Sequence, residues 1–187
     1  MKKTLALIQM NVVAGDVEHN YKHVVELLDE AMQSNPDIIV LPETWNTGFH
    51  PSEDLPNLAD PDGERTKALF STYAKDHNVN IVAGSVSVLK HDQVFNTSYA
   101  FNREGRVVGE YSKMHGFTPA KEDKYFAGGT HVGHFELDGI PCSTVICYDI
   151  RFPEVVRMAA LPGTELLFVP AQWPTMRLRH WQVLNEV

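Results

Sequence analysis

The chain has 187 residues, 43% of them hydrophobic and 21% charged, and carries a formal net charge of −8. This composition is typical of one globular domain that is long enough to bury a core. The acidic balance argues against a nucleic-acid-binding surface, which needs a concentration of Lys and Arg. No apolar run approaches the ~20 residues that a membrane-spanning helix requires.

The first predicted element is a β-strand over residues 4–11. Two lysines and a short apolar run give the N-terminus a brief likeness to a signal peptide. Gln9 and Asn11 interrupt that run, however, and Asp16 follows soon afterwards. A strand therefore explains the segment better than a secretory signal does.

Helices and strands then alternate through the first half of the chain. Apolar residues at helical spacing predict the helices, and short runs of β-branched residues predict the strands. The expected elements are a helix over residues 16–34, a buried strand over 37–43, a loop over 44–61, a helix over 63–78 and a strand over 79–89.

Hairpins are the main feature of the second half. Strands over 94–101 and 106–111 flank a turn at residues 102–105, and strands over 131–137 and 140–147 flank Asp138-Gly139. The remaining elements are a polar loop to residue 130, a helix from residue 152, a strand over 165–169 and a helix over 175–187. This order favours an α/β layered domain with a mixed sheet.

The two cysteines, Cys142 and Cys147, are predicted to stay reduced. Five residues of extended strand would separate them by about 16 Å, too far for a disulfide. Without a disulfide framework or a signal peptide, we expect a cytoplasmic protein. Cys142 is expected only to pack in the core.

Cys147 follows a predicted strand, and Phe152-Pro153-Glu154 indicates the start of the next helix. A thiol at such a turn would lie near backbone N–H groups that favour negative charge, so we predict a lowered pKa. The alternative is that Cys147 is an unreactive buried side chain.

Three chemically reactive side chains are predicted to lie at or just after strand ends: Glu43, Lys113 and Cys147. Ligands bind at strand ends in open α/β sheets, so these groups are expected to converge. A thiol nucleophile, a carboxylate base and a lysine that stabilises an oxyanion form a complete acyl-transfer set. Taken singly, Glu43 and Lys113 could each be solvent-exposed.

The chain resembles the nitrilase, or carbon–nitrogen hydrolase, superfamily over nearly its whole length, and in particular the amidase branch that includes the ω-amidases. Three of its segments are similar to that family's glutamate, lysine and cysteine motifs. These segments are Leu41-Pro42-Glu43 with Gly48-Phe49, Tyr111-Ser112-Lys113-Met114-His115, and residues 146–154; residues 170–174 and 179–182 also resemble the amidase branch.

The resemblance implies an αββα sandwich that usually pairs with a second subunit, so a homodimer is expected. It also implies that Cys147 is the nucleophile, Glu43 the general base and Lys113 the stabiliser of the tetrahedral intermediate. Glu122 would be a second active-site glutamate that orients Lys113, although a solvated charge run is an alternative for it. The backbone N–H of Tyr148 would assist Lys113, and neither a metal nor an organic cofactor is needed.

Several further residues near the motifs have structural alternatives. His115 is expected to shape the pocket or to pack, and Trp173 to line the pocket or to lie in the core. Arg151 and Glu154 are expected to form a structural ion pair. The histidines are scattered and show no metal-ligand spacing.

Members of the family continue beyond the point where this chain ends, Val187. We therefore expect one carbon–nitrogen hydrolase domain over residues 1–187 that is incomplete at its C-terminus. The favoured activity is release of ammonia from a small ω-amide of a dicarboxylic acid. The alternatives are nitrilase or carbamoylase activity, and a catalytically inactive fragment that at most binds a partner subunit.

Overall fold

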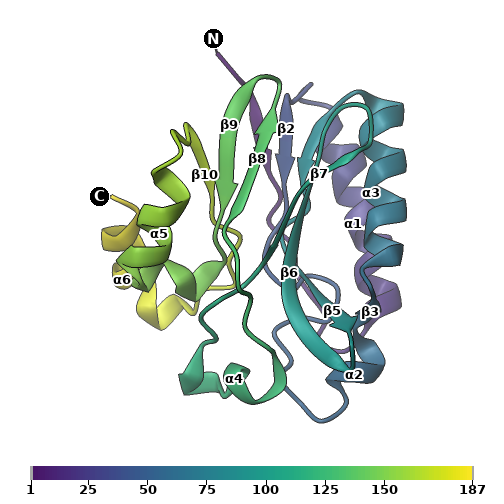
Figure 1. The fold of residues 1–187 in the computed structure, drawn as a ribbon. Helices are drawn as coiled ribbons and strands as arrows, with labels where there is room; N and C mark the ends of the chain where they lie inside the picture. Colours follow the sequence, from purple (N-terminus) through teal and green to yellow (C-terminus); the bar gives the residue numbers. More distant parts are fainter. Residues whose placement is uncertain (1, 187) are drawn as a thin grey trace.

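The computed structural model describes residues 2–186 and arranges them in four layers (Figure 1). Helices α1 (Val17–Met32) and α3 (Glu64–His77) cover the outer face of one β-sheet. Helices α5 (Pro153–Ala160) and α6 (Leu178–Asn185) lie on the outer side of a second sheet, and the two sheets face each other. The expected αββα sandwich is confirmed.

The first sheet mixes parallel and antiparallel strands. Its strand order is β1-β2-β4-β6-β5-β3, and β7 pairs with β6. Strands β1, β2 and β4 are parallel to one another, whereas β6 runs antiparallel to β4, β5 and β7. The bounds are Leu5–Leu7 (β1), Ile38–Val40 (β2), Asp60–Pro61 (β3), Asn80–Val82 (β4), Val86–Lys90 (β5), Gln93–Phe101 (β6) and Val107–Ser112 (β7).

The second sheet has the order β10-β9-β8. Strands β8 (Gly133–Leu137) and β9 (Ile140–Thr144) form the predicted hairpin around Asp138-Gly139. Strand β10 (Leu166–Phe168) returns parallel to β9 after α5, as a strand–helix–strand unit requires.

Two predicted strands differ from the structure. The strand expected over 4–11 is confined to β1, and the one expected over 79–89 is two strands, β4 and β5. Gly84 separates β4 from β5 with a left-handed φ of +61°. A Cβ atom at this position would lie 1.9 Å from the Pro42 carbonyl oxygen, so the chain turns where only glycine fits.

The two long predicted loops contain short elements that their sequences did not reveal. Helix α2 (Leu55–Leu58) lies within the first loop. The second loop contains a 3₁₀ turn, Thr118–Ala120, followed by helix α4 (Glu122–Tyr125). The last helix is also shorter than expected, because the 3₁₀ turn Thr175–Arg177 precedes α6. Elements of one turn lack the periodicity that pattern reading needs.

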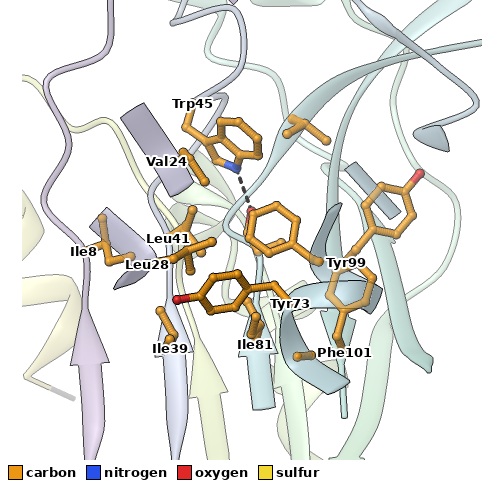
Figure 2. Packing of buried hydrophobic residues seen from close by; sticks show 14 of the residues in the cluster. Ile8, Val24, Leu28, Ile39, Leu41, Trp45, Tyr73, Ile81, Tyr99 and Phe101 are labelled. Carbon is orange, nitrogen blue, oxygen red and sulfur yellow. Dashed lines mark hydrogen bonds between the residues drawn. The ribbon is translucent and has the colours of Figure 1, made fainter. Parts of the chain in front are cut away.

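The main core fills the space between the first sheet and helices α1 and α3 (Figure 2). The indole of Trp45 is fully buried and donates a hydrogen bond of 2.8 Å to the Ala83 carbonyl. Other buried members of this core include Ile8, Val24, Leu28, Ile39, Leu41, Phe70, Ile81 and Phe101.

Neighbouring residues of β2 enter different cores. Ile39 packs towards the helices, whereas Ile38 packs with residues of the second sheet such as Leu137, Cys142 and Phe168. Both faces of β2 are therefore buried, which accounts for its uninterrupted apolar sequence.

Cys142 packs as predicted, and both cysteines are free thiols. Within residues 2–186, no helix is both long and apolar enough to cross a membrane.

Candidate active site

Glu43, Lys113 and Cys147 come together in the structure from three separate strand ends. Glu43 follows β2, Lys113 comes directly after β7, and Cys147 follows β9 at the start of the 3₁₀ turn Cys147–Arg151. The Nζ atom of Lys113 lies 2.8 Å from Oε1 of Glu43. All three side chains are buried, so their charges and protons interact with little screening by water.

Glu122 also contacts Lys113. Its side chain is fully buried, and its Oε2 and Oε1 atoms lie 2.8 and 3.0 Å from the Lys113 Nζ atom. Helix α4 presents this carboxylate, and the backbone N–H of Phe117 donates a hydrogen bond of 2.6 Å to it. The solvated alternative for Glu122 is therefore wrong.

Two residues that sequence reasoning did not select hold these carboxylates in place. The Asn96 side-chain amide donates to Glu43 Oε1 at 3.0 Å and to Glu122 Oε1 at 3.2 Å. The Gln172 backbone N–H donates to Glu43 Oε2 at 2.9 Å, and its side-chain amide donates to the Glu43 carbonyl. Asn96 is one of three consecutive polar residues in β6, which gives no signal that singles it out, whereas Gln172 lies in a motif already quoted.

Lys113 has an elevated pKa. Burial alone would lower the pKa, because it disfavours the charged ammonium, but the carboxylates of Glu43 and Glu122 outweigh burial. The net effect raises the pKa of Lys113 above its ordinary value. The ammonium is therefore charged throughout the physiological pH range and sits between two anions.

Cys147 has a raised pKa, and the prediction of a lowered pKa was wrong. Burial is the largest cause, the Glu43 carboxylate adds to it both by charge and by accepting a hydrogen bond from the thiol, and Lys113 opposes it. The backbone N–H groups of the short turn do not lower the pKa of the thiol enough to reverse these effects. The resting residue is a protonated thiol next to a carboxylate that can accept its proton.

The backbone at Cys147 adopts a left-handed conformation with a φ of +46°, which is strained for a residue with a Cβ atom. Its N–H donates to the Pro170 carbonyl at 2.9 Å. Buried Asp149 secures the turn, accepting hydrogen bonds from the Ile146 N–H at 2.9 Å and the Tyr111 hydroxyl at 2.7 Å. The strained turn is thus fixed from several sides.

His115 is expected either to shape the pocket or to pack, and in the structure it packs. Its Nδ1 atom lies 2.9 Å from Asp149 Oδ1, and its ring stacks on Phe152 with centroids 3.7 Å apart. It is not among the residues that line the cavity at Cys147.

A cavity opens at Cys147 and encloses about 440 Å³, part of it open to solvent. Tyr148 and Trp173 are part of its wall, so Trp173 lines the pocket, and its indole N–H also donates to the Arg177 carbonyl at 2.8 Å. The complete lining is Phe49, Lys113, Phe117, Cys147, Tyr148, Arg151, Gln172, Trp173, Pro174 and Arg177.

The expected ion pair between Arg151 and Glu154 is absent among the described residues. Glu154 is exposed, whereas Arg151 lines the cavity and donates from Nη2 to the His180 Nδ1 atom at 2.8 Å. The Arg151 guanidinium also lies 5.3 Å from the Trp173 ring centroid. Glu154 lies in the first turn of α5 and does not line the cavity, which sequence proximity to Arg151 alone does not reveal. Residues 2–186 contain no cluster of His, Cys, Asp and Glu suited to a metal ion.

Comparisons with known proteins place the chain in a family. The model of the carbon–nitrogen hydrolase family matches residues 4–187. A 2-oxoglutaramate amidase from Bacillus subtilis is 42% identical over 98% of this chain and 70% of its own length. A protein named as a hydrolase in the agr operon of Staphylococcus aureus is 36% identical over 95% of this chain and 69% of its own length.

Among solved structures, a CN-hydrolase superfamily protein from Xanthomonas campestris superposes with a TM-score of 0.86 at 28% identity. The match covers 98% of this chain and 70% of that one. The chain thus spans about 70% of the length of these relatives. With a family model that matches almost its entire length, this chain belongs to the carbon–nitrogen hydrolase family.

Proposed function

We propose that this carbon–nitrogen hydrolase is a cysteine-dependent amidase that releases ammonia from a small ω-amide of a dicarboxylic acid. The observation that carries the proposal is the buried cluster of Glu43, Lys113 and Cys147 beside an open cavity. The 42% identity to a protein named 2-oxoglutaramate amidase supports the choice of substrate class.

In the first half of the reaction, Glu43 accepts the proton of the Cys147 thiol while the sulfur attacks the amide carbonyl carbon. The Lys113 ammonium and the Tyr148 backbone N–H stabilise the oxyanion of the tetrahedral intermediate. The intermediate collapses as its C–N bond breaks, and protonated Glu43 returns its proton to the departing ammonia. The product of this half is a thioester on Cys147.

In the second half, Glu43 removes a proton from water, and the resulting hydroxide attacks the thioester carbonyl. The C–S bond breaks, the thiolate takes the proton back from Glu43, and the carboxylic acid leaves. One amide and one water thus give one acid and one ammonia, without oxidation or reduction. The raised pKa of Cys147 fits this scheme, because the thiol keeps its proton until attack begins.

Glu122 acts as a positioning residue in this proposal. Its two contacts with Lys113 and its bond from the Phe117 N–H fix the ammonium near Cys147. A lysine held by two carboxylates cannot swing away when the oxyanion forms, so the electrostatic stabilisation is preorganised.

The pocket favours a substrate that carries a negative charge of its own. Arg151 and Arg177 both line the cavity, and aromatic rings form much of the rest of its wall. A dicarboxylic acid mono-amide offers an amide at one end and a carboxylate at the other. Nitrilase and carbamoylase activities remain alternatives because the same three residues could serve them.

We further propose that the chain acts in the cytoplasm as a homodimer built from one domain over residues 1–187. The two free thiols support a reducing compartment. Sedimentation equilibrium would support the dimer if the mass is twice 21.0 kDa and would contradict it if the mass is 21.0 kDa at all concentrations.

The test is ammonia release from 2-oxoglutaramate, glutamine, succinamate and butyramide, with a nitrile and an N-carbamoyl amino acid for comparison. Cys147→Ala is expected to abolish release while remaining folded. The matched control, Cys142→Ala, removes the other buried thiol, which lies between the sheets, and is expected to retain activity. Release that survives in Cys147→Ala would refute the proposal, and no release from the folded unmodified chain would favour the inactive fragment.

A further inference from the structure

Arg177 is a cationic residue of the pocket that the catalytic scheme leaves without a task. It ends the 3₁₀ turn Thr175–Arg177 and lines the same cavity as Cys147 and Lys113. Its guanidinium carbon lies 5.2 Å from the Phe117 ring centroid, which is within the range of a cation–π contact. The side chain is half-buried rather than free in solvent.

The charge of Arg177 is not neutralised by its surroundings. No carboxylate within residues 2–186 lies at salt-bridge distance from its guanidinium, whereas Lys113 is bracketed by Glu43 and Glu122. The other pocket arginine, Arg151, also has no carboxylate partner within residues 2–186, but its Nη2 atom donates to His180 Nδ1 at 2.8 Å, and its buried Nε atom has no partner. The Arg177 guanidinium makes no hydrogen bond to any group within residues 2–186. Arg177 therefore offers its guanidinium to a molecule that enters the cavity.

The backbone of Arg177 is tied to the catalytic carboxylate through its neighbours. Its carbonyl accepts the Trp173 indole N–H at 2.8 Å, and its N–H donates to the Pro174 carbonyl at 2.8 Å. One residue before Trp173, the Gln172 N–H donates to Glu43 Oε2 at 2.9 Å. This continuous set of contacts fixes the base of the Arg177 side chain relative to the reacting groups.

We propose that Arg177 binds the distal carboxylate of the substrate and thereby sets the preference for ω-amides of dicarboxylic acids over neutral amides. The inference rests on the proposed amidase function, which it deepens. A carboxylate enclosed by aromatic walls loses hydration, and a planar guanidinium replaces it with two parallel charge-assisted hydrogen bonds.

Succinamate and butyramide provide a matched pair of substrates, because they share a four-carbon acyl chain and differ in a terminal carboxylate against a methyl group. Arg177→Gln is expected to lower kcat/KM for succinamate roughly 10- to 100-fold, mainly through KM, since a hydrogen-bonded charge is lost. For butyramide the change is expected to stay within about 2-fold. Arg177→Lys should restore part of the preference because it keeps the charge without the planar fork.

Arg179→Gln is the matched control, since Arg179 is exposed on the neighbouring helix α6 and does not line the cavity. It should leave both substrates unaffected. Equal losses for succinamate and butyramide in Arg177→Gln would overturn the inference and indicate a structural role. No loss for either substrate would overturn it as well, because the ratio of the two kcat/KM values would again be unchanged.

Binding separates this inference from the proposed function. Calorimetry on Cys147→Ala measures the affinities for succinamate and butyramide without turnover. The expected result is tighter binding of succinamate, lost on adding Arg177→Gln. If the unmodified chain releases no ammonia yet this Arg177-dependent difference is found, the proposed function fails and the inference stands. Equal affinities, or no succinamate binding, would overturn the inference whatever the activity.

Discussion

At the residue scale, both oxygens of the Glu43 carboxylate accept hydrogen bonds from neighbouring groups. Oε1 accepts from Lys113 at 2.8 Å and from Asn96 at 3.0 Å, and Oε2 accepts from the Gln172 N–H at 2.9 Å. These donors fix the direction of the carboxylate. A base that is held this way needs no reorganisation when the Cys147 proton moves.

Glu43→Gln keeps the shape of this side chain but removes its basicity. We expect kcat to fall about 10²- to 10⁴-fold, the range typical of a lost general base. The measurement is steady-state ammonia release at neutral pH, with Glu154→Gln as a control because Glu154 is exposed outside the cavity. Full activity in Glu43→Gln would mean that another group takes the thiol proton.

The raised pKa of Cys147 predicts slow alkylation near neutral pH. In a Cys142→Ala background, the rate of reaction with iodoacetamide should rise only above the ordinary thiol pKa of about 8.5. Adding Glu43→Gln should move the midpoint to lower pH, because the anion that opposes the thiolate is gone. A midpoint below pH 8.5 with Glu43 intact would contradict the raised pKa of Cys147. It would support instead the lowered pKa that the position of Cys147 at a turn predicts.

At the element scale, the segment between β2 and Glu43 depends on a close contact with the turn between β4 and β5. Gly84 in that turn approaches the Pro42 carbonyl so closely that a Cβ atom would lie 1.9 Å away. The Ser85 N–H, next in the chain, donates to the same carbonyl at 3.0 Å. This turn therefore positions the residue directly before Glu43.

Gly84→Ala should destabilise the fold by at least about 1 kcal/mol and lower activity, because it is strained in φ and displaces the Pro42 backbone. Gly139→Ala is the matched control: it also has a positive φ, +78°, but nothing lies within 4 Å of its Cβ position. Urea unfolding and ammonia release measure both effects. Equal losses for the two variants would show that backbone conformation alone, and not the contact, matters.

The β8–β9 hairpin is anchored by a charged network at its turn. Asp138 contacts Arg103 and Lys3, each at 2.8 Å, and Asp37 joins the same network through Arg103 at 2.9 Å. Hydrogen bonding from Arg103 holds the pKa of Asp138 below its ordinary value, against the opposing effect of burial. The network therefore ties the second sheet to the first.

Because the folded-state pKa of Asp138 is depressed, its stabilisation is present above its unfolded pKa of about 3.9 and is lost as pH falls through the folded value. Asp138→Asn should therefore lose about 1 kcal/mol at pH 7, in the range of partly exposed ion pairs. Its stability should also decline less steeply below pH 4 than that of the unmodified chain. Thermal melts across pH 2–7 measure both slopes, and parallel slopes would contradict the assignment.

At the scale of the whole molecule, the site is assembled from both halves of the sandwich. Glu43 and Lys113 follow strands of the first sheet, whereas Cys147 follows a strand of the second (Figure 1). The core between the sheets, which includes Ile38 and Phe168, therefore sets the distance between base and nucleophile. Truncation of a large side chain there, unlike the small change in Cys142→Ala, is expected to reduce activity before the chain unfolds.

Much of this arrangement could be predicted from the sequence. Apolar runs and helix-start signals are local patterns, and they predict that strands end at or just before Glu43, Lys113 and Cys147. The mixed sandwich follows from the order of helices and hairpins, together with the family resemblance.

The rest depended on contacts that the sequence does not encode locally. Asn96 is one of several polar residues in β6, and its contact with Glu43 joins residues 53 positions apart. Arg151 contacts Trp173 and His180, and not Glu154. The ion pair predicted from the short distance between Arg151 and Glu154 in the sequence is therefore absent among the described residues. The pKa of Cys147 depends on burial and on Glu43, neither of which a turn motif specifies.

The most direct measurement of the central claim is partitioning of the acyl intermediate between water and hydroxylamine. Succinamate and monomethyl succinate would deliver the same succinyl group to Cys147 from different leaving groups. A common thioester predicts the same ratio of hydroxamate to acid from both substrates, and no hydroxamate from Cys147→Ala. Ratios that differ between the two substrates, or hydroxamate formed by Cys147→Ala, would contradict nucleophilic catalysis by Cys147.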